Sequence, residues 1–438
     1  RDRARLESER SATVVSFIEQ MLATPTQAAL SGATVDLLDQ SVARAAAELA
    51  DDPLARAAVY RTAANAYVVH YRVDRARTLL DSALLLDRTH AGPESSEVGR
   101  DLTVAARLAY ISGRYDSAVT YTREAVRLLR SHPSQRPADY STALLYLGFA
   151  LAYTGHPDEG KPFVEEAIAI ERRRPGSSLL PYLYVALGDA EAFAGRLGDG
   201  VAAYRQAIAL FDSLPVPDPA ERGIAELGLS RLIAVGATLP EAGEHARRAL
   251  QIFVKRWGEV HPYTAQAHAH VGRLAALRGQ HDSALASVER ALGILEATGA
   301  ATIERVGLEF DYARVLFALR RYRDMEAVMA RARAAVLRDA PDSWFTLAAI
   351  DEYLGRALAG QQRFPEAEAR LRVAFDQFRR QFGEAHLQTQ SVGQALFQLY
   401  VILGDTPGAE SVAAVLPPDS VAVLRERARA GRRDLPRR

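Results

Sequence analysis

Apolar residues recur along this chain at intervals of three and four, and the helices that this spacing predicts come in pairs. In one stretch, Leu144, Leu147 and Leu151 share one face of a first helix, and a short polar turn follows. A second helix then places Phe163 and Ala167 on its buried side. The pattern predicts an all-α chain built from helix–turn–helix units.

Small residues return at a nearly fixed interval of 40 to 42 residues through nine copies of this unit. They stand at Ala76, Ala118, Gly160, Gly200, Ala242, Ala284, Met325, Ala367 and Ala409. Each of the first eight has an alanine seven positions further on, about two helical turns away on the same face. Such a period is typical of a stacked repeat array rather than of a globular enzyme. We therefore expect an α-α superhelix (solenoid) of about nine helix pairs.

One copy breaks the rule, because Met325 stands where the others have alanine or glycine. The small residue lets the two helices of a unit, and the first helix of the next unit, cross closely. A larger side chain is expected to widen the crossing in the seventh unit.

The repeats divide the chain into three expected parts. Residues 1–50 form a helical lead-in, with a charged first helix over 1–10 and a second helix over 35–50. Residues 53–416 form the array, and residues 417–438 form a polar capping helix with a basic tail. The units of the array are expected at 53–90, 97–131, 138–174, 179–213, 220–256, 262–297, 303–338, 344–381 and 388–416.

Composition narrows the classes of partner. The chain has 54 basic and 54 acidic residues, so no net charge draws it to nucleic acid or to an anionic membrane surface. It has no cysteine, which excludes disulfides and thiolate metal sites. No apolar run reaches the roughly 18 residues of a membrane span, so no membrane insertion is expected within this chain.

The spacing of small and apolar residues resembles that of a known repeat. The pattern Leu144, Leu147-Gly148, Gly155, Gly160, Ala167 resembles the tetratricopeptide repeat (TPR), and the 42-residue step resembles its kinesin-light-chain-like variety. The linker at 257–265, with the sequence WGEVHPYTA, is similar to that of the same variety. The resemblance covers about 53–416 and implies a solenoid that binds proteins or peptides.

The segment before the array resembles the junction that precedes such repeats in bacterial Ser/Thr protein kinases. The resemblance rests on residues 17–22, 32–39 and 48–49. It implies a longer parent protein, with a kinase domain and usually a membrane helix ahead of this piece. The array would then lie on the extracytoplasmic side of the membrane; without such a helix it would be cytoplasmic. The chain has no kinase glycine-rich loop, HRD or DFG motif, so we expect this piece not to be an enzyme.

Candidate chemistry within the array is sparse. Gly155 and Gly160-Lys161 match the spacing of a phosphate loop, but Pro162 stands where such a loop needs Ser or Thr. His268 and His270 diverge by about 200° on a helix, which favours packed or solvated histidines over metal ligands. We expect no catalytic residue, no cofactor and no metal.

Arginines supply the clearest functional signal. Eleven residues before five of the small residues stands an arginine, at Arg107, Arg231, Arg273, Arg314 and Arg356. The tetratricopeptide resemblance implies that this position faces the concave groove. Guanidinium groups suit an acidic peptide or a C-terminal carboxylate. The alternative is that the arginines pair within the chain, for example with Asp189 or Glu352, or serve no ligand.

Aromatic residues one or two positions away in other units extend the expected peptide-binding groove. They are Tyr110, Tyr153, Tyr182, Phe193, Phe310 and Phe317. The function expected is a protein–protein or peptide interaction scaffold, or a sensor region, of a bacterial Ser/Thr kinase. A free-standing regulator that binds a short signalling peptide is the alternative. The identity of the partner and the oligomeric state stay open at this point.

Overall fold

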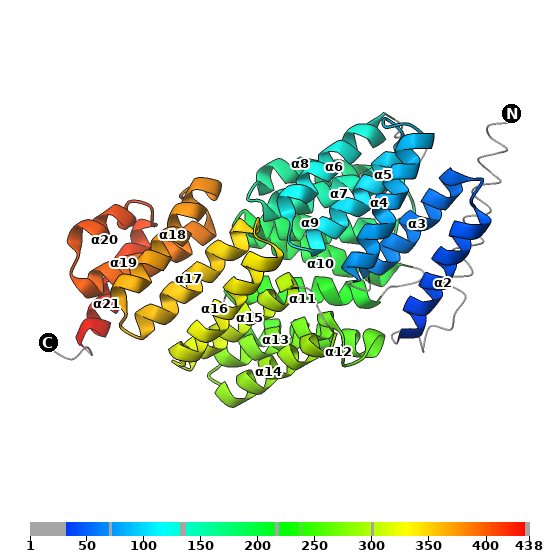
Figure 1. Cartoon of the computed structure of the whole chain (residues 1–438). Helices are drawn as coiled ribbons and strands as arrows, with labels where there is room; N and C mark the ends of the chain where they lie inside the picture. The colour runs from blue at the N-terminus through cyan, green and yellow to red at the C-terminus, as the bar shows by residue number, and fades with distance from the viewer. Residues whose placement is uncertain are drawn as a thin grey trace. The chain divides into compact units, whose positions relative to one another are not determined.

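The computed structural model describes residues 32–69, 72–131, 137–214, 219–236, 238–298 and 302–433. All regular secondary structure in these ranges is helical, as the sequence predicts (Figure 1). A single helix, α2 (Gly32–Glu48), precedes the pairs, and α21 (Pro418–Arg433) follows them. The charged helix expected over 1–10 lies outside the described residues.

Nine helix pairs lie between α2 and α21, and each begins within one residue of the start expected from the sequence. The pairs are α3 (Pro53–Val69) with α4 (Val73–His90), α5 (Ser96–Ile111) with α6 (Tyr115–Arg130), α7 (Pro137–Tyr153) with α8 (Pro157–Glu171), α9 (Leu180–Phe193) with α10 (Leu197–Ser213), α11 (Pro219–Val235) with α12 (Leu239–Trp257), α13 (Pro262–Leu277) with α14 (His281–Thr298), α15 (Thr302–Ala318) with α16 (Tyr322–Asp339), α17 (Trp344–Gly360) with α18 (Phe364–Phe382), and α19 (Leu387–Leu403) with α20 (Thr406–Ala413). The prediction of an all-α repeat solenoid is confirmed.

The small residues lie where helices cross. Ala284 is fully buried on α14 and packs in one cluster with Ala275 of α13 and Val315 of α15. The cluster therefore joins the two helices of one unit to the first helix of the next. At Gly200 on α10, an added Cβ would lie only 2.7 Å from the side chain of Leu232 on α11, so Leu232 would have to move to make room for it.

The seventh pair accommodates its methionine. Met325 is fully buried and packs against Ala313 and Leu316 of α15 and against Leu354 of α17. The wider crossing expected in this pair stays a prediction, which the distance between the axes of α15 and α16 tests.

The turn inside a pair is closed by a residue in the left-handed conformation. Glycine supplies it at φ values between 70° and 89° in five turns, at Gly113, Gly155, Gly195, Gly279 and Gly404. Only glycine enters this region without a steric penalty from Cβ. Arg320 (φ 56°) and Gln362 (φ 63°) adopt the same conformation in the seventh and eighth turns.

The chain divides into two compact units. One comprises residues 1–151 and 162–183, and the other comprises residues 152–161 and 184–438. The candidate residues Arg107, Tyr110 and Tyr182 belong to the first unit, and the others belong to the second. None of the described helices combines the length and the apolar character that a membrane crossing requires.

Two buried carboxylates share one arginine in the first unit. Arg61 on α3 donates to Asp87 on α4 at 3.0 Å and to Asp101 on α5 at 2.9 Å. Both aspartates are almost completely buried. Burial raises the pKa of Asp101 to about 7, and the adjacent Asp87 carboxylate adds to the rise, although Arg61 opposes it. One guanidinium therefore links three helices but does not compensate both negative charges fully.

A first prediction concerns the close crossings. Replacing Ala284 with Leu should lower the free energy of unfolding by about 1–3 kcal/mol, because no space is available between α13, α14 and α15. Ala286 lies on the exposed side of the same helix, so Ala286→Leu is the matched control and should change stability by less than about 0.5 kcal/mol. Urea denaturation followed by circular dichroism measures both. Equal losses of stability in the two variants would contradict the close packing at Ala284.

A second prediction concerns pH. The pKa of Asp101 is about 7 in the folded chain, whereas an unfolded aspartate titrates near pH 4. Between these values the folded chain holds a proton that the unfolded chain has released. The free energy of unfolding should therefore fall as pH rises from about 4 to about 7, and level off above that.

Asp101→Asn should reduce this pH dependence, because the amide does not titrate. The exposed Asp81→Asn is the matched control and should leave the pH dependence as it is. Urea denaturation of the full chain over this pH range tests the difference. An unchanged pH profile in Asp101→Asn would contradict the assignment.

Candidate functional site

Two of the five candidate arginines bond to residues of their own or a neighbouring unit outside the central group. Arg107 on α5 donates through Nη1 to Oδ1 of Asn65 at 2.8 Å, and Asn65 stands at the equivalent position of the preceding unit. Arg356 on α17 donates to Oε1 of Glu352 at 2.9 Å, and to the backbone carbonyl and the hydroxyl of Ser391, both at 3.1 Å. For these two, the structure shows the intramolecular pairing that the sequence left open.

The other three arginines form one group, which we call the arginine cluster: Arg231 on α11, Arg273 on α13 and Arg314 on α15. The three helices are neighbours, since α13 contacts both α11 and α15. Burial lowers the pKa of Arg273, and the positive charges of Arg314 and Arg231 lower it further, although Asp311 opposes them. The three charges therefore lie close enough to repel one another.

Asp311 is the acidic partner that Arg273 and Arg314 share. Arg314 donates to Oδ1 of Asp311 at 2.8 Å, and Nε of Arg273 lies 3.9 Å from the same oxygen. The guanidinium of Arg314 also lies over the ring of Tyr353, 5.5 Å from its centroid. The side chain of Arg314 nevertheless remains 43% exposed, and Arg231 is exposed as well. Two of the three cations thus share one carboxylate, and Arg231 and Arg314 stay open to solvent.

A buried histidine orients the central arginine. The hydroxyl of Ser230 donates to the backbone carbonyl of Ala242 at 2.6 Å, so it accepts from Nε2 of His270 at 2.7 Å. His270 therefore carries its proton on Nε2, and its Nδ1 accepts from Nη2 of Arg273 at 3.0 Å. Burial, with Arg273 and the two other cluster arginines, holds the pKa of His270 well below its usual range. A neutral imidazole thus fixes one guanidinium of the cluster.

An acidic residue lies near Arg231. Asp189 on α9 accepts a short hydrogen bond from the hydroxyl of Tyr204 on α10. Burial raises the pKa of Asp189 to about 6, whereas the Tyr204 hydroxyl and the charge of Arg231 oppose the rise. The sequence raised the possibility that Asp189 pairs with an arginine. In the structure that arginine is Arg231, whose positive charge attracts the Asp189 carboxylate.

The aromatic candidates lie in separate contacts. Tyr110 packs against Phe149, Tyr153 meets Phe193 edge-on, and Phe310 packs against Tyr353, with ring centroids 5.5, 4.7 and 5.2 Å apart. Phe317 meets Tyr322 edge-on at 5.7 Å, yet 42% of it is exposed. Tyr182 is partly buried. Of the six, Phe310 and Phe317 share helix α15 with a cluster arginine.

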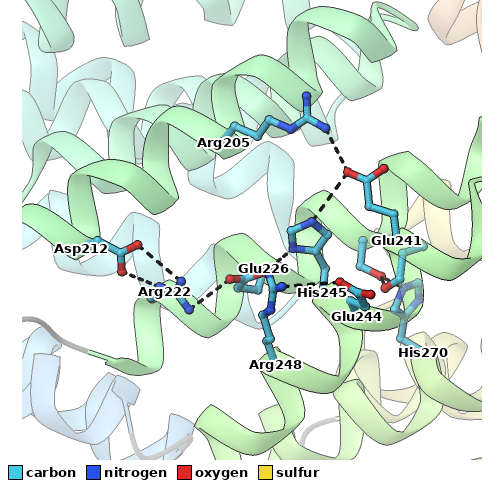
Figure 2. Close-up of polar contacts among 11 residues, drawn as sticks. Arg205, Asp212, Arg222, Glu226, Glu241, Glu244, His245, Arg248 and His270 are labelled. Atoms are coloured by element: carbon cyan, nitrogen blue, oxygen red, sulfur yellow. Dashed lines mark hydrogen bonds and ion pairs between the residues drawn. The ribbon is translucent and has the colours of Figure 1, made fainter.

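A second charged network joins α10, α11 and α12. Figure 2 shows the carboxylate of Glu226 between Arg222 and His245. Arg222 also donates to Asp212 at 2.6 Å, and Arg205 donates to Glu241 at 3.0 Å. Because Glu226 is fully buried and each of these charges has an opposite charge beside it, the network holds the helices together.

The phosphate-loop look-alike and the possible metal ligands show no sign of a binding site in the described residues. The phosphate-loop look-alike is a helix–turn–helix, and Lys161 forms an ion pair with Glu191 at 2.8 Å. Across the described residues, no group of three or more histidine and acidic side chains is placed to hold a metal ion. A hollow of about 310 Å³ at the α15–α16 turn is lined by Arg320–Asp324 and Gln361, and Arg321 pairs there with Asp324.

The sequence of one segment matches a known family. Residues 238–297, which span α12 to α14, match the tetratricopeptide repeat. This segment carries the tetratricopeptide repeat. The repeat fold suggested by the resemblance is thereby confirmed, and a repeat of this kind supports a role in protein–protein interaction. No curated protein matches the chain.

Solved structures of repeat proteins are similar in fold. BtubC (BKLC) from P. vanneervenii is 16% identical and has a TM-score of 0.43, over 50% of this chain and 90% of that one. A putative kinesin light chain from Podosopora anserina is 18% identical, with a TM-score of 0.37, over 47% of this chain and 97% of that one. A Rap protein complexed with competence and sporulation factor is 13% identical, with a TM-score of 0.46, over 77% and 99%. At these values the similarities carry no argument about function.

A third prediction concerns His270. Histidine NMR should show its Nε2–H tautomer and a neutral imidazole near pH 6.5, where a free histidine titrates, because burial and three arginines disfavour the imidazolium. Arg273→Gln removes one positive charge and should raise the pKa of His270. Arg248→Gln, on the adjacent helix α12, is the matched control. Titration of His270 in the wild-type chain near pH 6.5 would contradict the arrangement.

Proposed function

We propose that this chain is the interaction scaffold or sensor region of a bacterial Ser/Thr protein kinase and that its arginine cluster receives an acidic partner segment or a C-terminal carboxylate. The observation that carries the proposal is the group of three guanidiniums on neighbouring first helices, of which Arg231 and Arg314 are exposed to solvent. A partner carboxylate would bind the exposed faces of these two guanidiniums.

The chemistry of the cluster suits such a partner. A guanidinium donates two parallel hydrogen bonds to one carboxylate, and bonds of this kind are stronger than those between neutral groups. Arg273 is held in place by His270 before a partner arrives, so less side-chain freedom is lost on binding. The exposed Arg231 and Arg314 lie on the neighbouring first helices and extend the positive surface on both sides of it.

The kinase part of the proposal rests on the segment before the array. Residues 32–39 of that segment begin α2, whereas residues 17–22 lie outside the described residues. The sequence of the parent gene tests this part directly. A kinase domain with a membrane helix between it and the array is the expected result, and a reading frame that starts at the array contradicts it.

A free-standing peptide-binding regulator is the second candidate. It is favoured by the array itself, because the repeat periodicity of residues 53–416 needs no kinase domain to account for a peptide-binding module. The two candidates differ in the gene that surrounds the array. Both use the chain as a binding module, so both are compatible with an acidic partner at the arginine cluster.

A fourth prediction tests the cluster itself. The double variant Arg231→Glu and Arg314→Glu should weaken binding of a native partner by at least about tenfold, because two charge-assisted contacts become repulsive. The wild-type affinity should also fall as salt rises. Arg248→Glu with Arg290→Glu, two exposed arginines on second helices, is the matched control.

The partner is first captured with the wild-type chain and then titrated against each variant. Equal affinities for the wild type, the cluster variant and the control would remove the cluster from the binding surface. A loss confined to the cluster variant is the result that the proposal requires.

A further inference from the structure

The linker between α18 and α19 touches two turns that lie far from it in the sequence. The ring of Phe382 lies against Gly155, between α7 and α8, so an added Cβ at Gly155 would overlap two atoms of the ring. Leu387 lies over Gly195, between α9 and α10, where an added Cβ would be 3.7 Å from its Cγ. All four residues belong to the second compact unit. That unit therefore closes on itself across more than 190 residues of sequence.

Local contacts hold the linker in a fixed shape. Gly383 has a left-handed φ of 80°, and its carbonyl accepts from the hydroxyl of Thr389 at 2.8 Å. Nδ1 of His386 accepts from the backbone N–H of Gln388 at 3.2 Å. The imidazole also packs on the ring of Phe382, with centroids 4.1 Å apart. The linker thus presents Phe382 and Leu387 from a preformed structure.

The linker between α12 and α13 is built in the same way. Gly258 has a φ of 83°, and its carbonyl accepts from the hydroxyl of Thr264 at 2.9 Å. His261 stacks on Trp257, with ring centroids 4.3 Å apart. Because the same local contacts shape both linkers, residues 382–389 do not need the distant turns to hold their form.

Closure leaves a buried polar atom without compensation. Nε2 of His386 is buried and has no hydrogen-bond partner among the described residues. Burial lowers the pKa of His386, and the nearby backbone of Phe193 opposes this shift. Leu387 remains 46% exposed in the closed arrangement. A few apolar contacts stand against one desolvated nitrogen, so closure is only weakly favoured.

We propose that the linker 382–389 is a latch, which closes the second unit when it docks on Gly155 and Gly195 and opens it when it leaves them. Helices α11 to α18 lie between Gly195 and Phe382 in the chain. Docking at both ends fixes the curvature of these repeats, and release lets it change through small shifts between packed helices. The arginine cluster is carried by α11, α13 and α15, so the latch controls the spacing of its guanidiniums.

Pulsed electron paramagnetic resonance between two spin labels measures the latch in the full chain. The chain has no cysteine, so Gly198→Cys and Glu384→Cys carry the only labels. Both positions are exposed, and an added Cβ at Gly198 meets no described atom within 4 Å. The labelled chain should give a narrow distribution of short distances, because Gly198 lies close to Gly195 and Glu384 lies in the linker.

Two substitutions should open the latch independently. Gly155→Asn keeps the left-handed turn, which asparagine tolerates, but places a side chain where the ring of Phe382 lies. Leu387→Asp removes the apolar contact with Gly195, while its carboxylate suits the N-terminus of α19. Each should lengthen the main distance between the labels by about 10 Å or more, the separation of two packed helices.

Matched controls separate the latch from local effects. Gly279→Asn makes the same substitution in the turn between α13 and α14, where an added Cβ meets no described atom within 4 Å. Val260→Asp introduces the same charge into the linker between α12 and α13, at a valine that is 58% exposed. Both controls should keep the short distance. Lengthening in the controls equal to that in the latch variants would contradict the latch.

Two further results would overturn the proposal. The first is an unchanged distance in both Gly155→Asn and Leu387→Asp, with the helical circular dichroism signal retained. The second comes from a urea titration of the labelled chain. A latch should release at a lower urea concentration than the one that unfolds the helices. Loss of the short distance only together with the helical signal would make the closure a permanent part of the fold.

Discussion

The helices of the second unit can pack closely only because small residues stand where they cross. The surface formed by these helices depends on that packing. At Ala284, three helices from two consecutive pairs share one small packing site. This site sets how near the first helices of neighbouring pairs can lie. Residues at equivalent positions on those helices are consequently brought side by side, although they stand 41 or 42 residues apart in the chain. The arginine cluster is a product of this packing.

Charge within the array is handled in two ways. Glu226 is fully buried between Arg222 and His245. Replacing it with a neutral residue would leave Arg222 without this ion-pair partner. Arg273, in contrast, is held by a neutral histidine and a carboxylate shared with Arg314. The first arrangement ties helices together. The second keeps the guanidinium of Arg314 partly exposed at the surface, although Asp311 pairs with it.

Much of the fold could be predicted from the sequence because its determinants are local and repeated. The start of every pair was predicted to within one residue, since periodic apolar faces and small residues mark each helix in turn. Met325 was recognised as exceptional for the same reason. The division into lead-in, array and cap stays a prediction, and the two compact units of the structure follow from packing that no local pattern encodes.

The candidate site could be predicted only in part. Periodicity found the five arginines, but it could not separate Arg107 and Arg356 from the cluster. Their partners, Asn65 and Ser391, stand 42 and 35 residues away, and the pairing depends on side-chain rotamers. The role of His270 was missed because its hydrogen bond to Ser230 spans 40 residues. The i, i+3 spacing of Asp311 and Arg314 was the available signal for the shared carboxylate.

The central claim is that packing at small residues assembles one binding surface from the first helices of successive units. Hydrogen exchange of the full chain, with and without its native partner, tests this claim most directly. The account predicts that added protection centres on α11, α13 and α15, while the second helices α12, α14 and α16 change little. Protection centred on the second helices, with α11, α13 and α15 unaffected, would contradict it.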